Sequence, residues 1–105
     1  MADSKFSICE DRSGNKTIKL ILNGSASSSN ADILHHKLDD ILKSGYKSII
    51  INMKDVSFLA SGGIRVLLMF YKISMGRGIS FYIEDPSENV KNVLGMAALD
   101  EMMLK

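Results

Sequence analysis

The side chain best placed for chemistry in this sequence is the hydroxyl of Ser61, which is followed directly by Gly62 and Gly63. An apolar repeat at helical spacing comes next, so the Ser61 oxygen is expected to cap the start of a helix. The positive end of the helix dipole favours negative charge at that place. The two glycines are expected to leave the start of the helix uncovered. Ser61 is therefore a candidate structural N-cap, and any phosphate attached to its hydroxyl would lie at the positive end of the helix dipole.

The other chemically active side chains do not suggest a second site. His35 and His36 are adjacent, and adjacent residues on a helix point about 100° apart, so they cannot hold one metal ion together. The acid pairs Asp39-Asp40 and Glu84-Asp85 have no nucleophile or histidine directly beside them. Solvated surface charge is the better interpretation of both pairs. We therefore predict no enzyme activity, no metal and no cofactor.

Two elements are expected to position Ser61. The segment from Ser48 to Met53 contains three consecutive isoleucines, which suits a parallel strand that is covered on both faces. A short loop then leads to a helix that runs to Gly76. Its expected inward face consists of Ile64, Leu67, Leu68, Tyr71 and Met75. Its opposite stripe consists of Gly62, Arg65, Met69 and Lys72. Met69, an apolar side chain between two cations, is either a stray surface residue or part of a binding surface that begins at Ser61.

The remaining elements complete one α/β domain over residues 1–105. Strands are expected at 6–9 and 17–22 as a hairpin, and at 79–84. A helix from about Ala31 to Ser44 should end at Gly45, and its apolar stripe is Leu34, Leu38, Ile41 and Leu42. A last helix should begin near Glu88, with an inward face of Val90, Val93, Leu94 and Ala97. The order β-β-α-β-α-β-α predicts a mixed, mostly parallel sheet with helices packed on it.

Composition excludes several classes of function. At 105 residues, with 46% hydrophobic and 24% charged residues, the chain has the balance of an ordinary single globular domain. A net charge of +1 gives no electrostatic reason to bind nucleic acid or an anionic membrane. No apolar run approaches the ~20 residues of a membrane span, and Met1 to Lys5 carries no export signal. The single cysteine, Cys9, favours a reducing compartment. The expected location is the cytoplasm.

The segment from Asp55 to Leu68, D-V-S-F-L-A-S-G-G-I-R-V-L-L, resembles the signature of STAS domains, the anti-sigma factor antagonists of bacteria. Ser61 occupies the phosphoacceptor position of that signature. The usual Asp is replaced by Ala60, and the second Ser by Gly62. Two weaker similarities flank it: Leu22 to Ser27 resembles a strand-end motif, and Val93-Leu94 with Ala98-Leu99-Asp100 resembles the closing segment.

This resemblance implies a bacterial signalling protein that works by partner switching. Unphosphorylated, it would bind an anti-sigma factor that is also its serine kinase, and so release a sigma factor for transcription. Phosphorylation of Ser61 would break the complex, and a serine phosphatase would restore it. The expected partner-binding residues are Ser27, Ala60, Gly62, Gly63, Arg65, Met69 and Lys72.

Ser27 stands where many relatives of that family carry an acid. It is either an ordinary loop serine or, with Ala60, part of a less acidic pocket that lowers the repulsion felt by a phosphate. The alternative function is a ligand-binding or scaffolding STAS module, as in stress-sensing assemblies or transporter-associated subunits. Such a module would hold an anion or a partner non-covalently at the bare amides of Ser61, Gly62 and Gly63.

Overall fold

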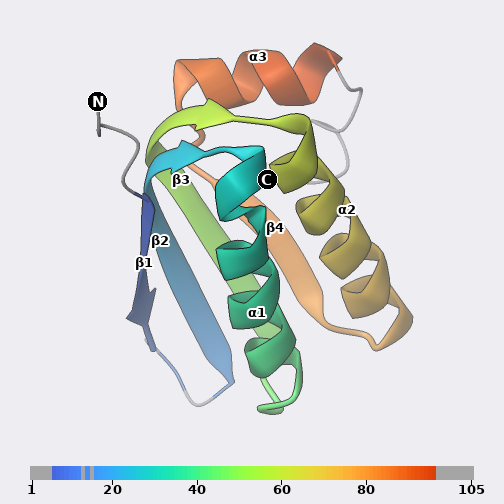
Figure 1. Ribbon diagram of the computed structural model, residues 1–105. Helices are drawn as coiled ribbons and strands as arrows, with labels where there is room; N and C mark the ends of the chain where they lie inside the picture. The colour runs from blue at the N-terminus through green and yellow to red at the C-terminus, as the bar shows by residue number, and fades with distance from the viewer. Residues whose placement is uncertain (1–5, 13, 15, 97–105) are drawn as a thin grey trace.

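The structure, a computed structural model, describes residues 6–12, 14 and 16–96. The described elements follow the predicted order β-β-α-β-α-β-α (Figure 1). They are β1 (Phe6–Asp11), β2 (Thr17–Ala26), the 3-10 turn η1 (Ser28–Asn30), α1 (Ala31–Leu42), β3 (Ser48–Leu59), α2 (Ser61–Gly76), β4 (Ser80–Glu84) and α3 (Glu88–Met96). Ala97, expected on the inward face of α3, and the Ala98-Leu99-Asp100 segment lie outside the described residues.

The four strands form one mixed sheet in the order β1-β2-β3-β4. β1 pairs antiparallel with β2, whereas β2 with β3 and β3 with β4 are parallel pairs. The two parallel connections run through α1 and α2, which lie side by side over one face of the sheet (Figure 1). The predicted mixed, mostly parallel sheet with packed helices is therefore confirmed.

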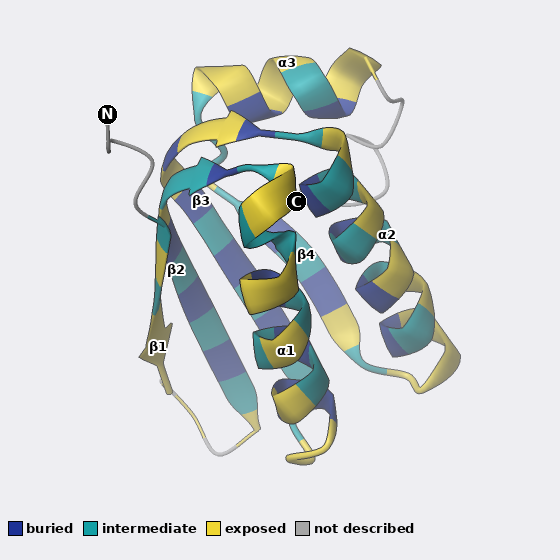
Figure 2. Cartoon of the chain, viewed as in Figure 1, coloured by how far each residue is buried: buried dark blue, intermediate teal, exposed yellow. Residues whose placement is uncertain are grey.

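The core lies between this sheet face and the two helices (Figure 2). In α1 the buried residues are those of the predicted stripe: Leu34, Leu38, Ile41 and Leu42. Gly45 lies in the turn that follows α1. Its φ is positive, at 85°, a conformation that glycine adopts without strain. In α3, Val90 and Leu94 are fully buried and Val93 is half-buried.

The second face of the sheet is not covered by α1 or α2. Ile49 and Ile51 point into the core, whereas Ile50 is only half-buried, so the expectation of a strand covered on both faces is wrong. The reason is topological: both crossover helices lie on one side, and α3 packs against the last part of β3.

Lys19 and Glu84 form a 2.8 Å ion pair. The hydrogen bond that Lys19 donates lowers the pKa of Glu84 below its usual range.

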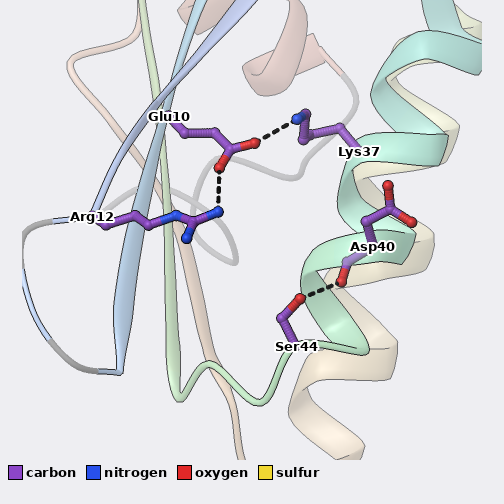
Figure 3. A network of polar contacts seen from close by, with 5 residues as sticks. All are labelled: Glu10, Arg12, Lys37, Asp40 and Ser44. Atoms are coloured by element: carbon purple, nitrogen blue, oxygen red, sulfur yellow. Dashed lines mark hydrogen bonds and ion pairs between the residues drawn. The ribbon is translucent and has the colours of Figure 1, made fainter.

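The edge strand β1 is joined to α1 by a short polar network (Figure 3). The Lys37 ammonium of α1 donates to the Glu10 carboxylate of β1, and Arg12 donates to the same carboxylate at 3.1 Å. These hydrogen bonds hold the pKa of Glu10 below its ordinary value. Just after α1, Ser44 Oγ donates to the Asp40 carbonyl in the last turn of that helix at 2.8 Å.

Candidate functional site

The end of β3 leads directly into α2, with one residue between strand and helix. Leu59 ends the strand, Ala60 is the N-cap with extended backbone (φ −84°, ψ 167°), and Ser61 is the first helical residue. The amide of Ile64 donates to the Ala60 carbonyl at 3.0 Å and forms the first helical bond. The expected loop is therefore absent from this junction. The expectation that Ser61 caps the helix is also wrong, because a capping residue needs the extended backbone that Ala60 has.

Ser61 is exposed, and among the described residues its hydroxyl makes no hydrogen bond. Since no side chain caps α2, its first-turn amides lack a side-chain acceptor. The first turn of α2 also contains no acidic residue, so the positive end of the helix dipole is not compensated locally. This end of α2 therefore presents a free hydroxyl in a place that favours negative charge.

The two glycines after Ser61 are required by close packing within the chain. A Cβ on Gly62 would lie 3.0 Å from Ser28 Oγ, and one on Gly63 would lie 2.9 Å from Leu59 Cδ1 and 3.2 Å from the Ala26 carbonyl oxygen. Gly63 is buried and Gly62 half-buried. The interpretation that both leave the backbone uncovered is therefore wrong: they let η1 and the end of β2 approach the start of α2.

The η1 segment has internal hydrogen bonds, and the end of β2 that precedes it is joined to the Ser61 segment. Ser27 is half-buried, and its Oγ lies 2.9 Å from Ser29 Oγ. Asn30 Nδ2 donates to the Ser25 carbonyl at 2.8 Å. The amide of Ala60 donates to the Ala26 carbonyl at 2.9 Å, which ties the two strand ends together. The structure thus brings the loop that contains Ser27 beside the segment that contains Ser61.

The two segments that meet at the site carry no ionisable side chain. They are residues 23–31 and 56–64, which are joined by the pairs Ser25–Phe58 and Ala26–Leu59. Asp55 and Asp32 lie just outside these segments, and Arg65 is the first charged residue after Ser61 along α2. These two segments therefore place no charge beside Ser61.

Sequence reasoning missed two residues here, Phe58 and Ser28. Val56 faces the core opposite Gly24, but Ser25 pairs with Phe58, so Ser57 is an extra residue in β3. Such a bulge shifts the alternation of side chains between the faces. As a result Phe58 is 51% exposed and Leu59 is buried. Ser28 belongs to a serine-rich cluster that is visible in the sequence. Its contact with Gly62, however, depends on long-range packing that the cluster does not reveal.

Three of the four residues predicted on the outer side of α2 are exposed, whereas Gly62 packs against η1. Arg65 and Lys72 are exposed, and Met69 is 38% exposed. The inward face is only partly as predicted: Leu67 is buried, and Ile64, Leu68 and Tyr71 are half-buried. Met75 is 61% exposed, so its expected inward position is wrong.

The residue that takes the inward position on α2 is Phe70. It is buried, and its ring packs edge-on against His35 of α1, with 5.2 Å between ring centroids. The sequence could not single it out because apolar residues surround nearly the whole circumference of α2. A periodic stripe is visible only where polar residues interrupt it.

Other candidate sites are separate from this one. Within the described part of the chain, no group of three or more His, Cys, Asp or Glu side chains could hold a metal ion. No helix in the described ranges is long and apolar enough to cross a membrane. An open cleft of about 540 Å³ is lined by residues that do not belong to the Ser61 site: Lys54, Asp85, Pro86 and Lys91.

Gly63→Ala is expected to lower the free energy of unfolding by ~1–2 kcal/mol. The new methyl group would press on the Ala26 carbonyl, whose bond to the Ala60 amide joins the two strand ends, and on Leu59. Gly76→Ala is the matched control, because nothing lies within 4 Å of a Cβ at that helical position. Chemical denaturation of both variants measures the difference; equal stabilities would contradict the close packing at Gly63.

The chain matches one protein family and several solved structures over most of its length. A model of the STAS domain family matches residues 12–105. A search of curated proteins finds no match. The solved structure of the anti-sigma factor antagonist SpoIIAA in its unphosphorylated form is 18% identical and has a TM-score of 0.82, covering 93% of this chain and 86% of that chain. An anti-sigma factor antagonist from Mycobacterium paratuberculosis is 16% identical with a TM-score of 0.85, covering 97% and 86%.

The fold also occurs inside a larger protein of another kind. A murine anion transporter of the Solute Carrier 26 family matches with 19% identity and a TM-score of 0.68. The match covers 84% of this chain and 15% of the transporter chain. At these identities, the likeness to all three structures is a likeness of fold.

Proposed function

The chain belongs to the STAS domain family, and on that premise we propose that it is an anti-sigma factor antagonist switched by phosphorylation of Ser61. The observation that carries the proposal is the state of the Ser61 hydroxyl. It is exposed, it has no hydrogen-bond partner among the described residues, and it lies at the first residue of α2, where two segments without charge meet. A phosphate there would meet the positive end of a helix dipole and no adjacent carboxylate.

In the unphosphorylated state, the surface around Ser61 would bind an anti-sigma factor and so release a sigma factor for transcription. Ser27 and Ala60 would form its inner part, and Arg65, Met69 and Lys72 would extend it along the outer side of α2. Gly62 and Gly63 would contribute by letting η1 pack against α2 rather than by direct contact. A role with a sigma factor implies the bacterial cytoplasm.

The partner would also be the serine kinase that ends the interaction. The γ-phosphoryl group of ATP would move to Ser61 Oγ: an oxygen–phosphorus bond forms, the bond to the β-phosphate breaks, ADP leaves, and the hydroxyl proton is lost to a base of the kinase or to water. The product carries about −1.5 to −2 additional charge. If the patch is desolvated in the complex, an uncompensated charge costs ~3–5 kcal/mol. A serine phosphatase would hydrolyse the ester and restore binding.

A ligand-binding or scaffolding module is the second candidate. Two observations favour it: the uncapped first-turn amides of α2, and the likeness of fold to part of an anion transporter. The loss of the acid at Ala60 also separates this chain from the standard signature. Incubation with ATP and the partner kinase distinguishes the two functions, because the switch requires covalent phosphate whereas the module requires reversible anion binding.

After kinase treatment, we expect phosphate on Ser61 and on no serine of the 25–29 cluster or at Ser57. Ser61 is exposed at the start of α2, whereas Ser25 and Ser27 are half-buried and Ser27 interacts with Ser29. Peptide mapping by mass spectrometry locates the modification, and Ser61→Ala should abolish it. Phosphate on another serine, with Ser61 unmodified, would refute the proposed switch.

A further inference from the structure

Arg65 is positioned to interact with any group attached to Ser61. The two residues lie four apart on α2 and both are exposed. Residues four apart on a helix are neighbours, with ~5–6 Å between their Cβ atoms. Long side chains on a helix also lean towards its N-terminus, so that of Arg65 extends towards the turn of Ser61. A phosphate on Ser61 would therefore lie within reach of the guanidinium.

No other partner in the described part of the chain competes for Arg65. Arg65 makes no ion pair or hydrogen bond with any described residue, unlike Arg12, Lys19 and Lys37, each of which has a carboxylate partner. The segments around Ser61 contribute no charge. On the neighbouring helix α1 the first-turn acid is Asp32, and it forms no ion pair with Arg65. The guanidinium is thus free to bind a new anion.

We propose that Arg65 is the internal counter-ion of phosphorylated Ser61, and that phosphorylation thereby removes Arg65 from the partner-binding surface. This inference rests on the proposed function for the origin of the phosphate. Arginine binds phosphate through two parallel N–H donors and stays protonated at every physiological pH. One modification then has two effects on the interface: it adds a dianion, and it withdraws a cation that otherwise faces an acidic partner.

The test places phosphoserine at position 61 during translation, so that no kinase is needed. The second pKa of the phosphate, about 6, is then measured by ³¹P NMR titration in the full chain. Because Arg65 stabilises the dianion, Arg65→Gln should raise this pKa by ~0.4 pH unit, as follows from ~0.5 kcal/mol for such a helical pair. Arg65→Lys should cause a smaller rise, since lysine keeps the charge but loses the two-donor geometry.

Lys72→Gln is the matched control on the same exposed side of α2. Lys72 is eleven positions from Ser61 (72 − 61), or about 16 Å along the helix, beyond the screening length at physiological salt. It should leave the phosphate pKa unchanged. Equal phosphate pKa values in the parent and in Arg65→Gln would overturn the inference. Because the phosphate is installed without a kinase, that result is separate from whether a kinase modifies Ser61, which the peptide mapping decides.

Discussion

Ser61→Asp is expected to bind the anti-sigma partner roughly 10²-fold more weakly than the parent protein, whereas Ser61→Ala should bind as tightly as the parent. An aspartate places a permanent negative charge at the first residue of α2, in a patch whose neighbouring segments carry no charge. If the partner excludes water there, burying a carboxylate that the partner does not neutralise costs ~3 kcal/mol or more. That free energy corresponds to about two orders of magnitude in the dissociation constant. Calorimetric titration against the partner measures both variants.

Thermal stability separates this electrostatic effect from misfolding. Since the Ser61 hydroxyl makes no described hydrogen bond and Ala60 is the N-cap, Ser61→Ala removes no cap and should leave the melting temperature nearly unchanged. Ser61→Asp should stabilise α2 by ~0.3–1 kcal/mol, because an acid in the first turn complements the helix dipole. A weaker complex formed by an equally or more stable protein is the expected result. Equal affinities of parent and Asp variant would argue against a charge-based switch.

Periodicity identified the elements whose polar and apolar residues are clearly separated. The buried stripe of α1 was predicted residue by residue because only polar residues lie between Leu34, Leu38 and Ile41. In α2 the apolar residues are nearly continuous, so the pattern allowed several inward faces and missed Phe70. The three isoleucines of β3 could not show that α1 and α2 both cover the same face of the sheet, because that depends on which side each crossover takes.

The candidate site was recognised from its motif, but its geometry was not. The sequence singled out Ser61 and the glycines, but the N-cap of α2 is Ala60, one residue before the predicted position. Helix boundaries are commonly uncertain by one or two residues. The contact of Ser28 with Gly62 and the exposure of Phe58 depend on register irregularities between β2 and β3. Such irregularities arise from long-range pairing, which no local pattern encodes.

Met69→Glu is expected to weaken partner binding by ~1–3 kcal/mol, or about 5- to 150-fold, with little change in melting temperature. Met69 is 38% exposed on the outer side of α2, between the exposed cations Arg65 and Lys72. As part of the interface, its thioether would supply adaptable apolar contact while the cations select an acidic partner face. A glutamate removes that contact, partly neutralises both cations, and repels an acidic partner.

Met75→Glu is the control. Met75 is 61% exposed and lies on the same helix, at the end opposite to Ser61. It should leave the affinity unchanged. Stability should fall little in Met69→Glu, since Arg65 stands four residues before the new carboxylate and Lys72 three residues after it, both at helical pairing distance. A large fall in melting temperature would show that Met69 supports the core. Unchanged affinity at unchanged stability would remove this side of α2 from the interface and confine partner binding to the segments around Ser61.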